Sequence, residues 1–511
     1  MKAYSILFDV VSTEHDEPGT QPECFKDLYL DQIVTAATAG REDYHLTRFF
    51  HLPLKRLQSI GYRQAVFRDL EDPVLVGQLR IFAQHMDAMR KVLAGVDKLW
   101  YLRQKQRGFL EAVNDYCLAV NSLARDLAAA KMRSIALWGF RDYLLAYQRS
   151  EAFRGLEQEI QTLKGDLAKI EYRLQIEGLR IKVSRYESDP DYGEEVARTF
   201  AKFREGQARQ TFDFKVLHSS FFMSSVEAAI LDRVALLFPA EFSALEQFNL
   251  RHRTYLDPSI ANFDRELQFY LGFQELIEPL KRAGLAFCYP DVTDCSKDID
   301  CHGAFDLALA VKWSGKSVPV TNDLYLQHPE RILVVSGANQ GGKTTFARMV
   351  GQLHYLGRLG CPVPARDAKL FLFDELFTHF EHEEDLNTLR SKLEDDLVRI
   401  HAILERATPR SLLVMNESFS SSTLKDALLL SRETLRQIVE RDLICVFVTF
   451  LDELASFGRS TVSMVATVMT DDPAQRTFKI VRKPADGLAY AVAVAAKHGL
   501  TEERIRERLS E

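Results

Sequence analysis

Apolar residues in the early part of the chain recur at helical spacing. From about residue 27 to residue 150 they return at intervals of three or four positions, and Leu75, Leu79, Phe82 and Met86 form one such stripe. This spacing places apolar side chains along one face of a helix. The long alternation of a half-buried strand is missing from the region. We therefore predict that residues 27–150 are helical throughout.

Residues 151–186 carry a more regular apolar seam. Its members step alternately by four and three residues: Leu156, Ile160, Leu163, Leu167, Ile170 and Leu174. This repeat is typical of a long helix packed against another helix, such as an arm. An ordinary amphipathic helix buried on a domain explains the seam equally well, so both interpretations stay open.

A small tip is expected between two helical arms. Residues 181–186 turn strand-like, and residues 194–209 again have helical spacing. A second long helical region follows over residues 224–284. This order predicts an outgoing arm, a mixed tip near residues 180–215 and a returning arm.

The pattern changes after Pro290. The polar segment 291–303 is predicted to be a linker. Beyond it, short apolar runs alternate with helical patterns, which indicates an α/β domain. The predicted strands cover residues 332–335, 370–373, 412–415, 443–448, 462–469 and 478–482. The chain is therefore expected to be a multidomain protein of class α + α/β.

Composition limits the classes of protein that the chain can represent. Its 511 residues, 46% of them hydrophobic, suffice for several folded cores. The net charge of −7 gives no global electrostatic case for nucleic acid, so any such surface must be local. Basic residues of the expected tip are candidates for gripping a phosphate backbone, although acidic residues are about as common there: Arg180, Lys182, Arg185, Lys202, Arg204 and Arg209.

The seven cysteines form no C-x-x-C pair, and their odd number fits reduced thiols in a cytosol. Cys295, Cys301 and His302 are close in sequence, but their spacing matches no zinc template. The short apolar run Ile6–Phe8 is interrupted by Asp9 and is neither a signal nor a transit peptide. No window approaches 18 uncharged apolar residues, so we expect a cytoplasmic protein that spans no membrane.

The most informative motif lies within residues 332–345. Gly337, Gly342, Lys343 and Thr344 fit G-x-x-x-x-G-K-[ST], the loop that cradles nucleotide phosphates. An apolar strand-like run precedes the loop, and apolar residues at helical spacing follow it. This order aims main-chain N–H groups and a helix N-terminus at phosphate. Lys343 is predicted to reach the β- and γ-phosphates, and the Thr344 hydroxyl is predicted to bind Mg²⁺.

Taken together, these residues resemble the MutS family of mismatch-repair ATPases. Residues 337–345, G-A-N-Q-G-G-K-T-T, are similar to the family loop G-P-N-M-G-G-K-S-T. Residues 361–365, C-P-V-P-A, resemble its F-V-P-A sequence, and residues 489–508 resemble its closing helices. The order of arm, tip, returning arm and ATPase domain also matches the layout of the family.

The resemblance implies a helical core with lever and clamp arms, followed by a C-terminal ABC-type P-loop ATPase domain. The expected segments are an N-terminal segment, a helical core, a lever helix with a clamp-like tip, returning helices with the linker, and the ATPase domain: 1–26, 27–150, 151–230, 231–300 and 301–511. It further implies ATP and Mg²⁺ as cofactors, DNA as a partner held mainly through its backbone, and a homodimer. The implied nucleotide contacts are Gly337, Ala338, Asn339, Gln340, Gly341, Gly342, Lys343, Thr344, Thr345, Asn322 and Ser391.

The strand expected to hold Mg²⁺ departs from the family pattern. It ends in Asn416-Glu417, where the family has Asp-Glu. An Asn carbonyl still accepts a Mg²⁺-bound water, but it holds the metal less firmly because it has no charge. Glu417 keeps the position of the general base that orients the attacking water, unless the site is degenerate. Asp374 follows a rival apolar strand, and we expect it on a neighbouring strand near the phosphates.

Two further positions depart from the family pattern. Phe450 stands where the family senses the γ-phosphate with a His, and Phe offers no hydrogen bond. Asn322 matches the family, but Pro319 stands at the place of the adenine-stacking Phe, so another side chain would have to stack.

Residues 383–396 correspond to the loop that crosses to the partner's nucleotide. The resemblance implies that Ser391 there contacts the partner's γ-phosphate. A charged, solvated helix is the alternative interpretation of the same segment.

The sequence therefore predicts an ATP-gated clamp on DNA, in mismatch repair or in the recognition of unusual DNA structures. Only about 26 residues precede the helical core, so a mismatch-reading domain is not expected, nor is a nuclease tail after Glu511. Asn416 and Phe450 leave open a nucleotide-gated scaffold with weak or no turnover. A MutS-like ATPase that acts on branched DNA or a ribonucleoprotein is the third alternative.

Overall fold

The structure is a computed structural model that describes residues 3–9, 19–186, 223–381, 391–469 and 475–485. The chain divides into two compact units that are not continuous in sequence. The helical unit comprises residues 1–3, 72–131 and 139–264, and the α/β unit comprises residues 4–71, 132–138 and 265–511. Helices α7 (Ile135–Arg149) and α12 (Pro258–Arg282) contribute residues to both.

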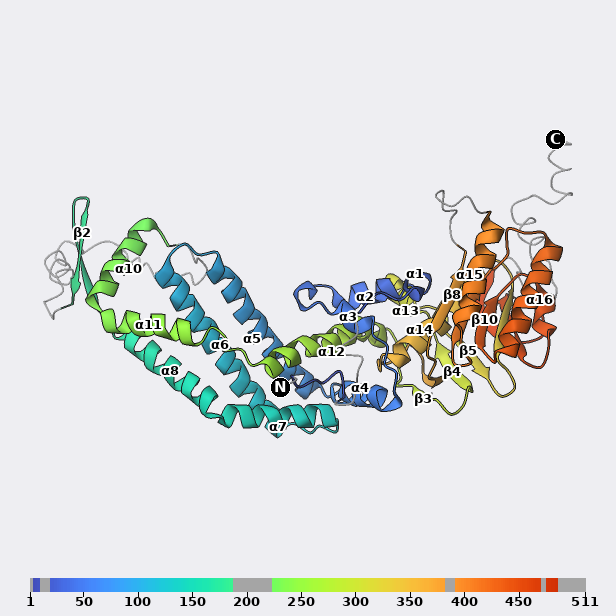
Figure 1. Ribbon diagram of the computed structural model, residues 1–511, viewed down its shortest axis with the longest axis horizontal. Coiled ribbons are helices and arrows are strands. Elements are labelled where there is room, and N and C mark those ends of the chain that lie inside the picture. Colours follow the sequence, from blue (N-terminus) through green and yellow to red (C-terminus); the bar gives the residue numbers. More distant parts are fainter. Residues whose placement is uncertain (1–2, 10–18, 187–222, 382–390, 470–474, 486–511) are drawn as a thin grey trace, which may run out of the picture. The chain divides into compact units, whose positions relative to one another are not determined.

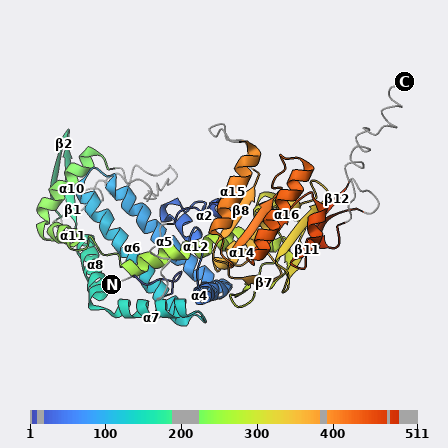
Figure 2. The ribbon, with the colours of Figure 1, turned by 45° about the vertical axis from the view of Figure 1, so that its right-hand side comes forward.

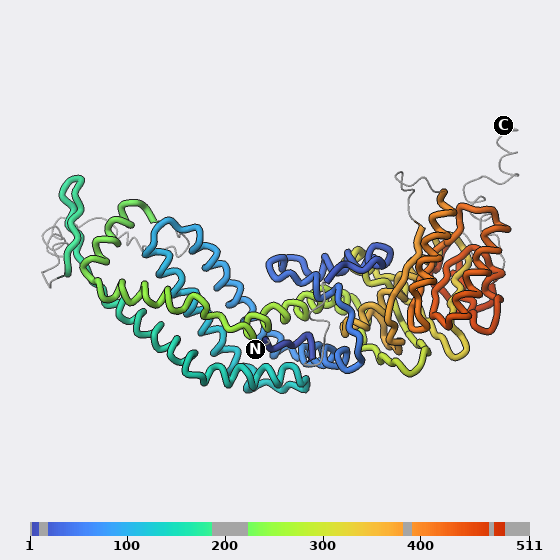
Figure 3. Tube along the Cα trace, viewed as in Figure 1, coloured from blue at the N-terminus to red at the C-terminus, as the bar shows by residue number. Residues whose placement is uncertain are grey.

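The helical unit is built around the hairpin of α5 (Pro73–Asp97) and α6 (Leu102–Ala129), which lie side by side in Figure 1. Asp72 caps α5 by accepting a hydrogen bond from the main-chain N–H of Val74. Helices α8 (Glu151–Ala168) and α11 (Pro239–Arg251) both contact α6, as the tube in Figure 3 shows. Helix α10 (Ser225–Leu237) begins at a capping box.

The seam predicted over residues 156–174 is helical only in its first part. Leu156, Ile160 and Leu163 are buried on α8, but the helix ends at Ala168. Leu174 lies instead in β1 (Tyr172–Glu177), which pairs antiparallel with β2 (Arg180–Arg185). The turn between the strands uses Gly178 at φ +60°, a conformation that glycine adopts without strain. The prediction of one helix through Leu174 was therefore wrong.

The rest of the expected tip is only partly described. Arg180 and Lys182 are exposed on β2, and Arg185 donates to the main-chain oxygen of Leu237. The helix predicted over 194–209, and with it Lys202, Arg204 and Arg209, lies outside the described residues.

A six-stranded sheet forms the centre of the α/β unit. Its strand order is β12-β11-β6-β10-β9-β8. All neighbours are parallel except β11 and β12, which are antiparallel. The bounds are β6 (Ile332–Gly337), β8 (Leu376–Phe380), β9 (Leu412–Asn416), β10 (Ile444–Val448), β11 (Thr461–Val468) and β12 (Arg476–Arg482). The buried apolar runs β6, β9 and β10 confirm the α/β prediction.

Three helices flank the central strands, as Figure 2 shows: α14 (Lys343–Arg358), α15 (Lys392–Arg406) and α16 (Leu424–Glu440). Helices α15 and α16 bury apolar residues such as Leu404 and Ile438 against Leu413 and Phe447 of the sheet. Helix α14 contacts β9 and β10. The helix predicted after the phosphate loop is thereby confirmed.

A second sheet has the order β3-β7-β4-β5. Its strands are β3 (Asp291–Thr293), β4 (Ile299–Ala304), β5 (Asn322–Leu326) and β7 (Asp367–Phe371). Segment 291–303, predicted to be a linker, therefore contains strand residues. Its polar residues hid the buried positions Ile299 and Cys301, which alternate with an exposed residue.

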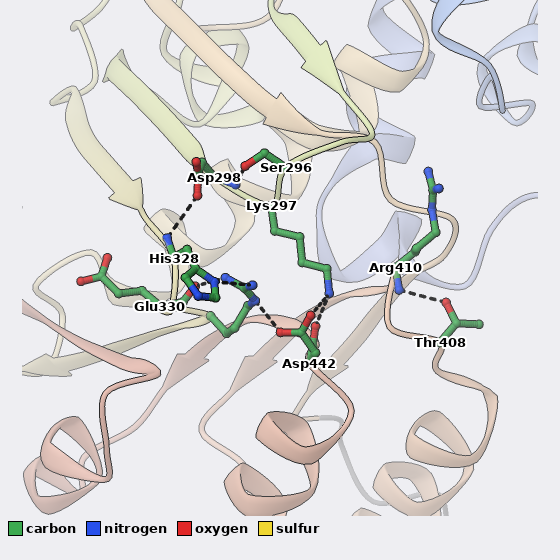
Figure 4. Close-up of polar contacts among 9 residues, drawn as sticks. Ser296, Lys297, Asp298, His328, Glu330, Thr408, Arg410 and Asp442 are labelled. Atoms are coloured by element: carbon green, nitrogen blue, oxygen red, sulfur yellow. Dashed lines mark hydrogen bonds and ion pairs between the residues drawn. The ribbon is translucent and has the colours of Figure 1, made fainter.

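Asp442 makes hydrogen bonds with residues that flank both sheets, and Figure 4 shows this side chain beside Lys297. Its carboxylate accepts hydrogen bonds from Lys297 Nζ at 2.5 Å and from Arg331 Nε at 2.6 Å. Lys297 lies between β3 and β4, whereas Arg331 directly precedes β6. Burial alone would raise the pKa of Asp442, but these two cations outweigh it and hold the pKa below its usual value.

The early part of the chain completes the α/β unit. Ile6, Leu7 and Phe8 are buried, and Glu266 accepts from the main-chain N–H of Ile6 at 2.6 Å. Further helices are α1 (Cys24–Asp27), α2 (Leu30–Thr38), η2 (Glu42–Tyr44), α3 (Thr47–Phe50), α4 (Leu57–Asp69), α13 (Leu307–Trp313) and η3 (Asp452–Ser456). Within the described ranges, no helix has the length and apolar character needed to cross a bilayer.

Candidate functional site

The loop between β6 and α14 closes around its own lysine. Lys343 Nζ donates to the main-chain oxygens of Gly337 and Ala338, at 2.9 and 3.2 Å. It also donates to Asn339 Oδ1 at 3.1 Å. All three acceptors are neutral, so the ammonium charge is solvated by the loop without being neutralised. The predicted order of strand, glycine loop and helix is present as β6, the loop and α14, while the binding of nucleotide by these residues stays a prediction.

Two glycines of the loop have conformations that other residues avoid. Gly337 has φ +103°, and a Cβ there would lie 2.9 Å from the main-chain oxygen of Ala466 on β11. Gly342 has φ +92° directly before the first turn of α14. Thr344 and Thr345 follow in that turn, where free N–H groups and the helix dipole favour an anion.

A cavity of about 670 Å³ opens beside the loop. Lys343, Thr344 and Thr345 line it from α14, and Glu417 lines it from the end of β9. Burial lowers the pKa of Lys343, while the negative charge of Glu417 opposes that shift. The structure thus brings the two predicted catalytic residues, Lys343 and Glu417, to the same cavity.

Asn416 is the last residue of β9, and Glu417 directly follows it. In the sheet, β10 lies between β9 and β6. Asn416 is 8% exposed, and its Oδ1 has no hydrogen-bond partner among the described residues. Glu417 donates its main-chain N–H to the main-chain oxygen of Val448 at 3.0 Å. A buried carbonyl oxygen without a protein partner is costly, so Asn416 Oδ1 is free to accept a hydrogen bond from water or to contact a cation.

The donor set around this strand end suits Mg²⁺ only in part. Thr344 offers a hydroxyl oxygen and Asn416 an unpartnered amide oxygen, and both are ligand types that Mg²⁺ accepts. In the part of the chain that the structure describes, no group of three His, Cys, Asp or Glu side chains could hold a metal. The residues therefore fit a Mg²⁺ that is held largely by the phosphates and water, as is usual for nucleotide sites.

Asn322 lines the cavity, but its side chain also joins β5 to β12. Its Oδ1 accepts from the main-chain N–H of Ile480 at 2.7 Å, and its Nδ2 donates to the Phe478 oxygen at 3.3 Å. Besides the buried Phe346, two aromatic side chains line the same cavity, Trp313 at the end of α13 and Phe478 on β12. Both are partly exposed, at 37% and 48%.

Sequence reasoning missed Trp313 and Phe478. Phe478 lies within β12 (Arg476–Arg482), which contains the strand predicted over 478–482, but its φ of +57° makes the main chain irregular there. No local sequence pattern predicts a positive φ for a phenylalanine within a strand. Arg476 was missed as well, and its Nε donates to the main-chain oxygen of Asn339 at 3.0 Å. It adds a second cation beside the phosphate loop.

Ser391 caps helix α15. Its Oγ accepts from the main-chain N–H of Glu394 at 3.3 Å. It does not belong to the lining of the cavity beside the loop. Residues 382–390, which precede it, lie outside the described residues. Its predicted contact with a partner's nucleotide therefore stays a prediction.

Asp374 does not lie near the phosphate loop, and that prediction was wrong. It precedes β8, and its carboxylate accepts from Ser411 Oγ at 2.9 Å just before β9. The phosphate loop instead follows the carboxyl end of β6, which runs parallel to these strands. Asp374 therefore lies at the opposite edge of the sheet. The strand predicted at 370–373 also corresponds to β7 of the other sheet.

Phe450 follows β10 and does not belong to the cavity lining. Its neighbour Thr449 donates its main-chain N–H to Val335 on β6 at 3.0 Å. Sensing of phosphate by a side chain at position 450 has no chemical basis in this chain, because Phe offers no hydrogen bond.

The sheet, the loop and the cavity define an α/β domain in which a glycine-rich loop leads from the central strand β6 into the N-terminus of α14, beside a cavity. Residues 333–509 match the family model described as MutS domain V. The C-terminal part of the chain is MutS-like, which confirms the resemblance read from the loop sequence.

Parts of the chain are also similar to curated relatives named DNA mismatch repair protein MutS. The one from Fervidobacterium nodosum is 30% identical over 200 residues, which are 37% of this chain and 24% of the relative. The one from Lactobacillus helveticus is 27% identical over 247 residues, 47% of this chain and 28% of the relative. The one from Thermotoga maritima is 26% identical over 189 residues, 36% and 24% of the two chains. The matched region thus spans about a quarter of the length of these relatives.

Proposed function

We propose that the protein is a MutS-like ATP-binding and ATP-hydrolysing clamp that acts on DNA, in mismatch repair or on unusual DNA structures. The observation that carries this proposal is the single cavity that holds Lys343, Thr344 and Glu417 beside Asn416. The names of the curated relatives supply the link to mismatch repair.

In this proposal the triphosphate replaces the loop oxygens around Lys343. The ammonium exchanges the neutral oxygens of Gly337, Ala338 and Asn339 for phosphate oxygens, a stronger charge-assisted contact. The main-chain N–H groups of Gln340 to Thr345 complete the cradle. The base would stack on Trp313 or Phe478, which supply the aromatic surface that Pro319 does not.

Hydrolysis is assigned to Glu417. Its carboxylate would accept a proton from the attacking water and orient it in line with the γ-phosphate. Thr344 and Asn416 are the residues that would hold Mg²⁺, whose charge stabilises the phosphates when it is bound. Lys343 would offset the negative charge that develops on the transferred group.

The partners are proposed on the same basis. DNA would meet exposed basic residues such as Arg180 and Lys182 through its backbone. A homodimer would place Ser391 of one subunit at the γ-phosphate of the other. Nucleotide binding would then favour the closed state of the clamp and hydrolysis would release it.

A second function is favoured by one observation. Asn416 carries no charge where Mg²⁺ would bind, so the site can hold nucleotide and yet hydrolyse it slowly or not at all. The protein would then be a nucleotide-gated scaffold. Branched DNA or a ribonucleoprotein as the partner is the remaining alternative for an active ATPase.

The test is ATP turnover by the wild type and by Glu417→Gln, each without DNA and with homoduplex, mismatched or branched DNA. The proposal expects turnover by the wild type, ATP trapped on the variant and one DNA form that shifts the rate. If ATP binds but neither protein turns it over on any DNA, the scaffold function replaces the proposed one. If ATP does not bind at all, both fail.

A further inference from the structure

The turn that carries Glu417 has an uncommon backbone. Glu417 has φ +54° and Phe419 has φ +64°, so two non-glycine residues on either side of Ser418 are left-handed. Residues with a Cβ adopt this region only when their surroundings hold them there. The carboxylate of Glu417 is therefore aimed by whatever fixes residues 417–419.

Three buried polar side chains meet at this turn. His379 Nδ1 shares a hydrogen bond of 2.9 Å with Ser418 Oγ. On its other side, His379 Nε2 lies 3.3 Å from Asp396 Oδ1, within ion-pair reach but not aligned as a hydrogen bond. The exposed fractions are 1% for His379 and 7% for both Asp396 and Ser418. This chain of contacts joins β8, α15 and the end of β9.

Asp396 also holds the main chain beyond Ser418. Burial raises the pKa of this carboxyl, but His379 and a hydrogen bond from the main chain of Phe419 outweigh burial and lower the pKa below its usual value. Asp396 thus stays ionised and contacts both neighbours of the turn. Of these two partners, His379 also shares a hydrogen bond with Ser418 Oγ, and Phe419 directly follows Ser418 in the chain.

We propose that Asp396, His379 and Ser418 form a positioning relay that holds Glu417 in its working orientation and couples it to helix α15. The inference rests on the proposed hydrolysis at Glu417. A shift of α15, which begins directly after Ser391, moves Asp396 and thereby releases the turn. The relay gives the clamp a route by which events at Ser391 change the rate of hydrolysis.

The order Ser, His, Asp also occurs in hydrolases that use Ser as a nucleophile. Burial argues against that role here, because Ser418 is absent from the cavity lining and no substrate reaches its hydroxyl. A positioning role needs no access. The relay residues therefore act through Glu417 and contact no reacting atom.

Two other buried polar residues of the same unit serve as controls, because their side chains do not link separate helices or strands by a described hydrogen bond. Ser431 on α16 is 1% exposed, and its Oγ has no hydrogen-bond partner among the described residues. His354 on α14 shares a hydrogen bond with the Val350 oxygen of its own helix through Nδ1, its ring meets that of Phe373, and its Nε2 has no hydrogen-bond partner in the described part of the chain. Neither group joins separate elements by a described hydrogen bond or ion pair, so each is a matched control.

The experiment compares Ser418→Ala and His379→Gln with Ser431→Ala and His354→Gln in the full chain. The relay predicts that the first pair lowers kcat for ATP about tenfold or more, since a small misplacement of a catalytic group is enough for that. KM and the affinity for ATP are expected to stay within about twofold, because neither residue lines the cavity. The control pair is expected to keep both constants. His379→Asn, which keeps a polar atom near Nδ1, is expected to restore part of kcat.

Hydrogen exchange of the segment 416–422 separates the two proposals. Ser418→Ala is expected to exchange faster there than Ser431→Ala. If the wild type hydrolyses ATP and Ser418→Ala matches it in kcat, the relay is refuted while the function stands. If the wild type hydrolyses none, the function fails, and equal exchange in the two variants would then refute the relay as well.

Discussion

Two lysines near the amino and carboxyl ends of the central strands, the half-buried Lys297 and the buried Lys343, have different partners. At the amino edge, Lys297 donates to the carboxylate of Asp442, so its charge is neutralised. At the carboxyl edge, Lys343 donates only to neutral oxygens of its loop. Lys297 therefore has a carboxylate partner, whereas the described hydrogen bonds of Lys343 all go to neutral oxygens, which phosphate would replace under the proposed function.

The same contrast holds for the neighbouring polar groups. Asp374 at the amino edge has its carboxylate occupied by Ser411, while Asn416 at the carboxyl edge has an Oδ1 without a partner. Left-handed main chain does not distinguish the two edges, because Asp442 at the amino edge has φ +55° while Glu417 and Phe419 at the carboxyl edge have φ +54° and +64°. Hydrogen-bonded polar groups stabilise a fold, whereas Asn416 Oδ1, unpartnered among the described residues, directly precedes the Glu417 that lines the cavity assigned to nucleotide in the proposed function.

The sharpest test of this comparison replaces each of the two lysines by alanine and compares the effects on ATP affinity and on stability. Lys343→Ala is expected to lower ATP affinity at least about a hundredfold, because it removes the cation that meets the phosphates. Lys297→Ala is expected to leave ATP affinity within about twofold and to lower stability instead, since it leaves Asp442 with one cation fewer. Equilibrium binding of a fluorescent ATP analogue and urea unfolding measure the two effects. Equal loss of affinity in both variants would contradict the comparison.

Asn416→Asp tests whether the unpartnered oxygen belongs to a metal site. A carboxylate there is expected to lower the Mg²⁺ concentration for half-maximal ATP binding or turnover by about tenfold, because Mg²⁺ prefers charged oxygen ligands. The measurement is a Mg²⁺ titration at fixed ATP. An unchanged Mg²⁺ requirement would show that position 416 does not face the metal.

The parts of the fold that could be predicted from the sequence are those whose residues are close together along the chain. The phosphate loop was readable because its strand, glycines and helix are contiguous, and the apolar runs of β6, β9 and β10 were found for the same reason. Strand β8 was missed, since Thr378 and His379 interrupt its apolar pattern. Periodicity also does not say which sheet a strand joins, so residues 370–373 were assigned to the wrong neighbours.

The candidate site shows the same limit. Lys343 and Glu417 were predicted from local motifs. Trp313, Phe478 and Asp396 carry no motif, and each reaches the site through contacts between residues far apart in sequence. Such contacts are products of the packed fold, and no local spacing encodes them.

A smaller effect is expected at the aromatic side of the cavity. Trp313→Ala is expected to weaken ATP binding about fivefold, since stacking of an aromatic pair contributes about 1 kcal/mol. Inorganic triphosphate, which has no base, is expected to bind both proteins alike. Competition binding measures both ligands, and a loss of triphosphate affinity in the variant would assign the effect to the fold and not to stacking.

The smallest expected effect concerns the amino edge and its dependence on pH. Asp442 has a depressed pKa, so its ionic contacts stabilise the folded state above the unfolded pKa of about 3.9 and are lost as pH falls through the folded value. Asp442→Asn is expected to lower the free energy of unfolding by only about 1 kcal/mol at pH 7, because the side chain is 53% exposed and solvent screens the pair. Urea unfolding at neutral and acidic pH should show the difference between wild type and variant shrinking below about pH 4. A difference that stays constant across that range would mean that the contacts of Asp442 do not depend on its charge. The contrast between Lys297, which has a carboxylate partner, and Lys343, whose described acceptors are neutral, would then lose its physical basis.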